Sequence, residues 1–361
     1  MRPLRIAVGR TPPPEALRAV LVRDVRVDGE RWAKGRRLST EDLRRIARAD
    51  VVVDLGLRGS SDEPLPGTTA LPAVVLDPDE VHEDEAAIEL ARAAAGPGLR
   101  VRAPAESRVD LLARADGVLH VEVVRLRRLD AIDPLQVFTL YDGQVVRAGE
   151  VVGSVKIGPH AVAREVLERG LAAARARRGL VRVAPFVPRR VAAVVHETIR
   201  PLVRERFERS IESRVSSLGS TLVEIAYPGD TRQVESELRR LTGGRSRVDV
   251  VLTAGAASTD PTDPFFLAIA NLGGRVVRHG VPAHPGSMVW LARIRSTDLL
   301  GLPSCGAYSR ATAADLLLPR LLTGERASAR MAASLGHGGI LVREMRFRFP
   351  AYARELEAPA G

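Results

Sequence analysis

The side chains best suited to chemistry gather in a loop that directly follows an apolar run. The run, residues 248–252, is typical of a buried strand, and an apolar segment at residues 264–271 predicts a helix after the loop. The polar or flexible members of the loop are Thr253, Gly255, Ser258 and Asp263. A strand that leads into a small-residue loop and a helix start is how open α/β sheets bind anions, because backbone N–H groups can approach the ligand.

Two carboxylates follow predicted strands in this part of the chain. Asp230 ends the turn after a strand predicted at residues 221–226, and Asp263 ends the loop described above. A pair of carboxylates near a bound phosphate can hold a divalent cation such as Mg²⁺ or position a transferred group. Each aspartate also fits the N-cap of the helix that follows it, and Gln233 would complete a capping box at Asp230. Both interpretations stay open at this point.

Four segments resemble one protein family, and they occur in the family's order. TAGAASTDPTD, ending at Asp263, resembles the T-x-G-G-x-[SG]-x-x-x-x-D loop of the molybdopterin-binding domain in molybdenum-cofactor biosynthesis proteins. The others are AYPGD ending at Asp230, HPGSM at residues 284–288, and GLPSCGAYS at residues 301–309. The resemblance covers roughly Arg189 to Glu325.

The resemblance implies a fold, a ligand and a set of site residues. The fold is a three-layer α/β domain with a mostly parallel sheet, and the ligand or substrate is molybdopterin or a nucleotide-linked form of it. Asp263 and Asp230 become the catalytic and metal-holding residues, with Mg²⁺ as the expected ion. The implied ligand-binding residues are Thr253, Gly255, Ser258, Pro285, Gly286, Ser287, Pro303, Ser304 and Ser309. The family also implies a homo-oligomer.

Two classes of function follow from the resemblance. The first is a transferase that acts on molybdopterin, of the molybdotransferase or adenylyltransferase type. The second is a non-catalytic carrier or sensor of the molybdenum cofactor, with molybdoenzymes or other cofactor-assembly proteins as partners. His284 and Ser287 stand where the molybdotransferase branch has two lysines, which favours the carrier. The two aspartates favour the transferase.

Composition narrows the class of protein further. The 361 residues carry a formal net charge of +10, and all but two of the 54 cationic residues are arginines spread along the chain. The sequence contains no basic strand interleaved with aromatic residues, which stacking platforms for nucleic acid need, so we expect no nucleic-acid partner. No apolar run is long enough to span a membrane. The single cysteine, Cys305, and an N-terminus without an apolar signal core favour a cytoplasmic protein.

Patterning divides the chain into four ranges. They are a mixed α/β module at 1–99, a β-rich module with a helix and linker at 100–188, the molybdopterin-binding-like domain at 189–325, and a C-terminal tail at 326–361. Glycine-containing turns predict a hairpin over residues 108–123 and another over residues 138–157. Residues after Tyr352 are expected to fray.

Three further residues allow both a plain and a functional interpretation. His82, which precedes three acidic residues, fits either a metal cluster or the start of an acidic helix. Lys156 fits either a solvated strand end or a ligand-facing lysine. His196, after the strand predicted at residues 191–195, fits either an ordinary loop position or a residue that moves a proton.

Overall fold

The protein divides into two compact units, each interrupted in sequence. A computed structural model describes residues 1–361 except 51, 57–66, 105–107, 303–310 and 356–361. The first unit comprises Met1–Leu112, Val121–Thr139 and Val151–Arg182, and the second comprises Ala113–His120, Leu140–Glu150 and Val183–Gly361. The four ranges predicted from the sequence are finer than this division and stay a prediction. In the described part of the chain, no helix is long and apolar enough to cross a membrane.

The first unit begins with two small antiparallel sheets and a helix. One sheet contains β1 (Arg2–Ala7), β7 (Ala70–Val75) and β2 (Val20–Leu21). The other contains β4 (Glu30–Trp32), β3 (Asp24–Val27), β5 (Val52–Gly56) and β6 (Gly67–Thr68). Helix α1 (Thr40–Arg48) starts at the predicted Ser39, whose hydroxyl accepts a hydrogen bond from the Asp42 N–H while the Asp42 carboxylate accepts one from the Ser39 N–H. Trp32 is fully buried in the core between these elements.

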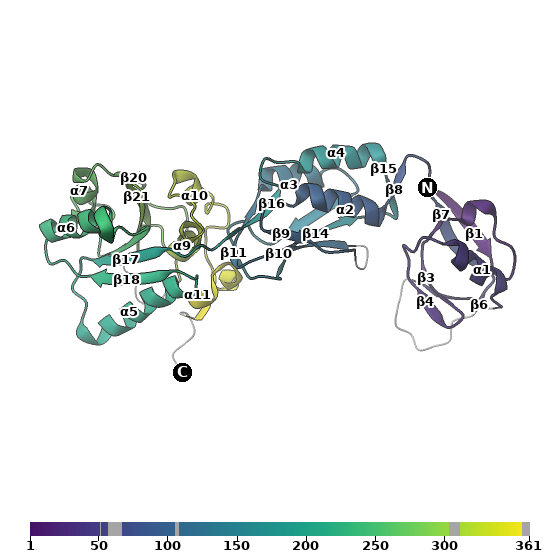
Figure 1. Ribbon diagram of the computed structural model, residues 1–361, viewed down its shortest axis with the longest axis horizontal. Helices are drawn as coiled ribbons and strands as arrows, with labels where there is room; N and C mark the ends of the chain where they lie inside the picture. Colours follow the sequence, from purple (N-terminus) through teal and green to yellow (C-terminus); the bar gives the residue numbers. More distant parts are fainter. Residues whose placement is uncertain (51, 57–66, 105–107, 303–310, 356–361) are drawn as a thin grey trace. The chain divides into compact units, whose positions relative to one another are not determined.

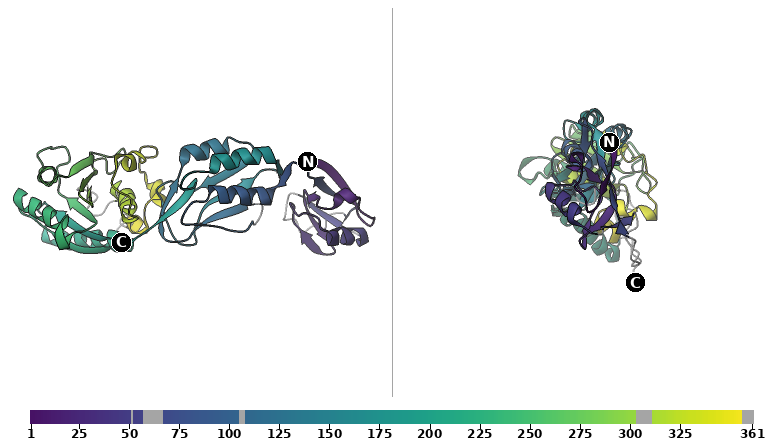
Figure 2. Two further views of the ribbon diagram at one scale, coloured as in Figure 1. Left: turned by 45° about the horizontal axis from the view of Figure 1, so that its top comes forward. Right: turned by 90° about the vertical axis from the view of Figure 1, so that its right-hand side faces the viewer.

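The rest of the first unit combines three helices with a four-stranded sheet. The helices are α2 (Glu83–Ala94), α3 (Val123–Asp130) and α4 (Arg164–Ala174). The sheet has the order β12 (Leu135–Thr139), β14 (Val151–Ile157), β10 (Arg108–Ala113) and β9 (Leu99–Val101). Helices α2 and α4 contact each other, and α2 contacts β14 (Figure 2). Two short strands, β8 (Glu80–His82) and β15 (Ala161–Ala163), pair beside them.

The hairpin predicted over residues 108–123 is wrong. Strand β10 has β14 on one edge and β9 on the other, so neither edge is free for β11 (Gly117–Val121). Strand β11 instead lies in a separate three-stranded sheet between β13 (Val145–Val146) and β16 (Val181–Pro185). The Asp116-Gly117 turn signal is local, whereas the pairing is decided by long-range burial of β10, whose last five residues are all buried.

The second unit is built on a six-stranded mixed sheet. Its order is β18 (Thr221–Ala226), β17 (Arg190–Val195), β19 (Val250–Ala254), β22 (Thr297–Gly301), β21 (Trp290–Ile294) and β20 (Arg275–Arg278). The first four strands are parallel to one another, and the last two run antiparallel to their neighbours. The expected parallel pairing therefore holds for one side of the sheet. The antiparallel pairing of β21 and β20 was not predicted from the sequence.

Apolar side chains of the central strands alternate between two cores on opposite faces of the sheet. In β17, Val191, Ala193 and Val195 join one core, while Ala192 and Val194 join the other. Helix α5 (Pro201–Ser216) and α9 (Ala314–Leu322) contribute to the first core, and α6 (Thr231–Leu241) and α7 (Pro264–Asn271) to the second (Figure 1). A strand buried on both faces explains the continuous apolar run of its sequence.

The described residues beyond Glu325 pack into the second unit. Helix α10 (Ala329–Ala333), the 3-10 segment Arg343–Arg348 and helix α11 (Ala351–Glu355) follow α9. Met331, Phe349, Tyr352 and Ala353 are buried in the same core as β17 and α5. We expected fraying only after Tyr352, and the buried Ala353 shows that packing extends at least one residue further.

Candidate functional site at the carboxyl edge of the sheet

Loops from five neighbouring strands leave the same edge of the six-stranded sheet. The parallel strands end in register, with pairs Val194–Ala226, Val195–Ala254 and Thr253–Gly301. Because β21 is antiparallel, its first residue, Trp290, pairs with the last residue of β22, Gly301. The loop before β21 therefore lies at the edge where the loops after β17, β18, β19 and β22 begin. The pairing brings four segments with family-like sequences to one edge.

Gly255 allows the loop after β19 to touch the loop after β17. Its φ is +89°, and a Cβ atom built on it would lie 2.5 Å from the carbonyl oxygen of His196. The His196 N–H also donates a 3.0 Å hydrogen bond to the Ala254 carbonyl. Only glycine fits this position, because any side chain would be both strained and in collision with backbone.

The half-buried imidazole of His196 connects this contact to the third strand end. Its Nδ1 lies 3.0 Å from the Pro228 carbonyl oxygen, which can only accept, so the ring carries its proton on Nδ1 when it is neutral. Its ring also meets Phe265 of α7 edge-on, with 6.4 Å between centroids. In the neutral ring, Nε2 is then the nitrogen that carries a lone pair. A proton-accepting role for His196 would use this nitrogen.

Asp263 is a brace for the loop as well as a helix cap. Its side chain is 5% exposed, and its two oxygens accept hydrogen bonds from two different backbone N–H groups. Oδ2 accepts from Ala257 at 2.7 Å, and Oδ1 accepts from Phe265 at 2.9 Å, in the first turn of α7. Both oxygens are therefore committed to holding the loop against the helix.

Asp230 is an exposed cap on α6. Its Oδ1 accepts a hydrogen bond from the Gln233 N–H at 2.8 Å, and the Gln233 side chain accepts one from the Gly229 N–H at 2.7 Å. The interpretation as an N-cap is thus correct for both aspartates. They differ in exposure and in the number of oxygens used, since a single Asp230 oxygen carries the capping bond.

Thr253 and Ser258 occupy different environments in the same loop region. Thr253, in β19, is 1% exposed, and its hydroxyl has no hydrogen-bond partner among the described residues. Its carbonyl accepts a 2.8 Å hydrogen bond from the Leu302 N–H, which connects β19 to the start of the loop after β22. Ser258 lies in the loop that Asp263 braces.

The segment at residues 284–288 lies between the start of α9 and the C-terminal part of the chain. The Pro285 carbonyl accepts a 3.0 Å hydrogen bond from the Ala313 N–H, and Gly286 has φ +108°. A Cβ atom on Gly286 would lie 2.6 Å from the Ala313 nitrogen, so glycine is required there too. Exposed Ser287 accepts a bond through its carbonyl from the Val281 N–H at 3.0 Å.

Two further elements lie near this edge. The backbone of His284 bonds to Gly339 and to Leu341, so residues 339–341 line this segment. Beneath the start of α9, the buried Asp315 accepts hydrogen bonds from the Thr312 N–H and from the guanidinium of Arg214, each at 2.9 Å. Arg214 lies in α5. In the amphipathic sequence of this helix, nothing distinguishes a buried arginine from an exposed one.

Three predicted ligand-binding residues, Pro303, Ser304 and Ser309, lie outside the described residues, as does Cys305. The described residues contain no group of three or more histidine, cysteine or acidic side chains placed to hold a metal ion. His82 is therefore not part of such a group. It caps α2 by accepting a 3.2 Å hydrogen bond from the Asp84 N–H.

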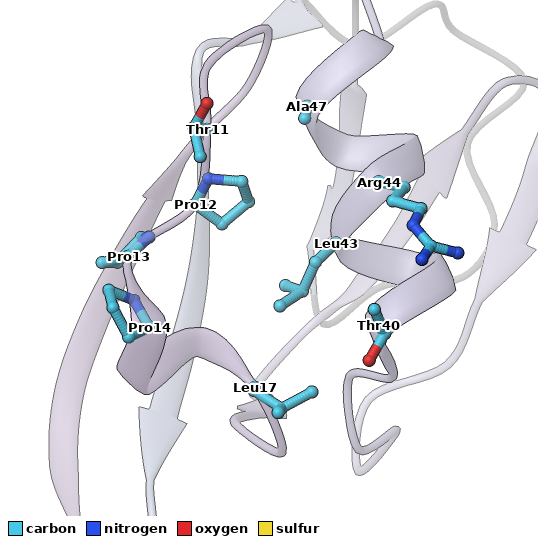
Figure 3. A pocket seen from close by; sticks show the side chains of 9 residues that line it. All are labelled: Thr11, Pro12, Pro13, Pro14, Leu17, Thr40, Leu43, Arg44 and Ala47. Atoms are coloured by element: carbon cyan, nitrogen blue, oxygen red, sulfur yellow. The ribbon is translucent and has the colours of Figure 1, made fainter.

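A groove of about 400 Å³ in the first unit offers little chemistry (Figure 3). Prolines 12–14 and Leu17 face Leu43 and Ala47 of α1 across it, with Arg44 as its one charged member. The apolar lining contains no acid, base or nucleophile, so we do not place a site there.

Comparison with known proteins identifies the domain that carries this edge. Residues 191–323 match the model of the family described as "Probable molybdopterin binding domain". The match covers the stretch from β17 to the end of α9, somewhat over a third of the chain. The resemblance expected for residues 189–325 is thereby confirmed. No curated protein matches the chain.

Solved structures give only distant likenesses to this chain. The molybdopterin biosynthesis moea protein from Pyrococcus horikosii is 14% identical, over 70% of this chain and 80% of that one, with a TM-score of 0.30. The molybdopterin biosynthesis enzyme MoaB from Thermus thermophilus is 16% identical, over 38% and 98%, with a TM-score of 0.27.

Proposed function

We propose that the protein binds molybdopterin at the carboxyl edge of the six-stranded sheet and acts in molybdenum-cofactor biosynthesis. The observation that carries the proposal is the family match over residues 191–323. The proposed ligand contacts are those expected from the sequence, namely Thr253, Gly255, Ser258, Pro285, Gly286, Ser287, Pro303, Ser304 and Ser309. The three-layer arrangement and a homo-oligomer are part of the same proposal.

The chemistry of the edge fits a flat ligand that is bound mainly by backbone. Gly255 and Gly286 each approach another backbone segment too closely for a side chain, which fixes two loops in place. The buried Thr253 hydroxyl adds a donor and acceptor without a partner in the described chain. Preformed loops with a few fixed polar groups are typical of small-molecule sites.

The start of α7 is less suited to a phosphate than its sequence suggested. The first helical residue, Pro264, has no N–H, and the Phe265 N–H already bonds to Asp263. A carboxylate therefore occupies the place that an anion would take at this helix N-terminus. We assign the phosphate of the ligand to the small-residue loop before Asp263 instead.

The two aspartates then take different proposed roles. Asp263, with both oxygens bound to backbone N–H groups, is a positioning residue that shapes the ligand loop. Asp230 is exposed, and its second oxygen is available to a ligand or to Mg²⁺. A catalytic role as a cation-holding carboxylate thus suits Asp230 better than Asp263, although both were expected from the sequence. Mg²⁺ would neutralise charge on a phosphate and orient the transferred group.

A non-catalytic carrier or sensor is the second candidate. The observation that favours it is the substitution at residues 284–288, where His284 and Ser287 replace two lysines of the molybdotransferase branch. The exposed backbone-bound His284 supplies no permanent positive charge for molybdate or phosphate. A carrier needs affinity for the ligand but no transition-state charge stabilisation.

Two measurements test the proposal and separate its alternatives. Protein purified from cells that make the cofactor should release an oxidised pterin with its characteristic fluorescence, and titration calorimetry should show saturable binding of molybdopterin. Incubation with Mg²⁺-ATP or with molybdate then distinguishes the two alternatives, because a transferase converts the bound molybdopterin and a carrier leaves it unchanged. Absence of both pterin and binding would refute the function, whereas binding without turnover would leave the carrier.

A further inference from the structure

The only two lysines of the chain line the same cavity in the first unit. Lys34 follows β4, and Lys156 lies in β14, more than 120 positions later in the sequence. The cavity has a volume of about 500 Å³. Among 54 cationic residues these two are the exceptions to arginine, and the fold brings both to one place.

The walls of this cavity, which we name the lysine cavity, are held by specific contacts. Glu83, the first residue of α2, accepts a 2.7 Å hydrogen bond from Nδ1 of His160, and its N–H donates to the His160 carbonyl at 3.0 Å. Gly35, next to Lys34, has φ +82° and approaches so closely that a Cβ atom would lie 2.8 Å from Oε1 of Glu83. Lys34 is therefore presented by a turn that packs directly on the helix start.

The charged side chains that line the lysine cavity are equal in number, with Arg31, Lys34 and Lys156 against Asp24, Glu83 and Asp84. Asp24 accepts hydrogen bonds from the Lys34 backbone N–H and from Arg31, which lower the Asp24 pKa, and Glu83 pairs with His160. Neither lysine ammonium makes a hydrogen bond or an ion pair within 4 Å to any residue in the described ranges. The two lysine ammonium groups therefore have no short-range partner, whereas Asp24 and Glu83 are already held by hydrogen bonds.

Asp84 is the third carboxylate of the lysine cavity. Asp84 also lines the cavity, and burial raises its pKa, which favours its neutral form relative to an exposed aspartate. Its neighbour His82, at 3.9 Å, lies at the start of the same helix. The lysine cavity thus combines an exposed and a half-buried ammonium donor with carboxylates that are largely held by hydrogen bonds, a chemistry suited to an anion between the two lysines.

We propose that the lysine cavity binds a tetrahedral oxyanion, either free or as the phosphate of a small phosphate monoester. Lysine binds phosphate as a point charge with three donors, and two lysines together match a dianion. A volume of about 500 Å³ admits an organic group beside the phosphate. This site lies wholly within the first unit and does not depend on the function proposed for residues 191–323.

Because there are just two lysines, each can be observed directly in the full-length protein. Reductive methylation with ¹³C-formaldehyde labels Lys34, Lys156 and the Met1 amine, and the dimethylated amines keep their positive charge. The Met1 amine, which pairs with Asp77 at 2.9 Å and with Glu80 at 2.8 Å, serves as an internal reference. Inorganic phosphate, molybdate and ribose 5-phosphate are then added in turn at constant ionic strength.

Saturable shifts of both lysine signals with an unmoved Met1 signal are the expected result. Tighter binding of ribose 5-phosphate than of inorganic phosphate assigns the site to monoesters, and equal or weaker binding assigns it to free oxyanions. Lysine shifts no larger than those caused by sodium chloride, or parallel shifts of all three signals, would overturn the proposal.

Charge-removing variants give an independent measurement by calorimetry with the same probes. Lys34→Gln and Lys156→Gln should each weaken oxyanion binding by about tenfold or more, the loss expected for one charge-assisted contact. Arg92→Gln, which removes an exposed cation of α2 outside the cavity, should leave binding unchanged. Unaltered binding in both lysine variants contradicts the site. Molybdopterin binding, measured on the same samples, reports separately on the second unit.

Discussion

The carboxylate of Asp263 accepts a 2.7 Å hydrogen bond from the N–H of Ala257, six residues earlier, and so closes the loop that follows β19. The other oxygen of the same carboxylate holds the Phe265 N–H at the start of α7. One side chain thus fixes both ends of the proposed ligand loop. This double use makes the loop sensitive to changes that an ordinary helix cap would tolerate.

Asp263→Asn should destabilise the protein by about 1–3 kcal/mol, because an asparagine has one acceptor oxygen for two backbone N–H groups and leaves one unpaired. If Asp263 acted only as an N-cap, the same substitution would leave folding intact, because asparagine caps helices about as well as aspartate. Urea unfolding of the variant measures the cost. Asp230→Asn is the matched control, since Asp230 caps α6 through a single oxygen, and it should change stability little. Equal stability of the two variants would contradict the bracing role.

Gly255→Ala should cost more than the roughly 1–2 kcal/mol of a left-handed alanine alone, because the new Cβ would also meet the His196 carbonyl oxygen at 2.5 Å. Gly273→Ala, at φ +67° with no atom within 4 Å of the added Cβ, provides the control for backbone strain. Thermal unfolding of both variants compares them. Molybdopterin binding should fall in the Gly255 variant and persist in the Gly273 variant. A cost at Gly255 no larger than at Gly273 would show that the two loops are not in contact.

Removal of one partner of the buried Arg214–Asp315 pair should be among the most damaging single changes in the second unit. Both side chains are 1% exposed, so Asp315→Leu removes the carboxylate that neutralises a buried guanidinium and should cost about 3–5 kcal/mol. The double variant Arg214→Met with Asp315→Leu should recover part of that loss. Arg209→Met, which breaks an exposed pair on the same helix, should cost at most about 1 kcal/mol. A double variant less stable than Asp315→Leu would argue against an uncompensated charge.

Alkaline pH should weaken the contact between α5 and Tyr227, the residue directly after β18. Burial, and next the hydrogen bond that Tyr227 donates to Glu208, raise the pKa of Tyr227 to about 12 from 10.0. The folded state therefore holds the phenolic proton more tightly than the unfolded state does. The resulting stabilisation is complete below pH 10 and is lost as the pH rises toward 12.

Unfolding free energies of the protein and of Tyr227→Phe, measured in parallel from about pH 8 upward, isolate this effect. The advantage of the wild type over the variant should be constant up to about pH 10 and then decline. Glu208→Gln should bring the decline to lower pH, but only partly, because burial is the larger cause. A constant difference across the whole range would show that Tyr227 titrates alike in both states.

The sequence predicted the parallel part of the second unit well, since its signals are local. Helix α7 and strand β18 fall at the predicted residues, because apolar runs bounded by proline, glycine and aspartate mark both ends. The positions of β10 and β11 could not be predicted in the same way, because their partners lie elsewhere in the chain. The turn between them is compatible with several pairings, and only burial selects among them.

The location of the candidate site was predicted from the sequence, but the structural role of each of its residues was not. Family-like segments at strand ends located the edge, and register then placed Trp290 beside Gly301. The second hydrogen bond of Asp263 depends on how the loop folds back, which residue types alone do not reveal. The contact between His284 and residues 339–341 joins segments more than 50 residues apart, and neither segment carries a pairing signal.

The burial of Phe349, Tyr352 and Ala353 beside β17 and α5 has a consequence for how the domain comes into being. The family boundary at residue 323 ends the matched sequence but not the hydrophobic core. A ribosome that has delivered residues 191–323 has not yet supplied the apolar surface that covers α5. The core around α5 is therefore complete only after residues 349–353 have been made, so the final packing of this domain follows the synthesis of residues 191–323 rather than accompanying it.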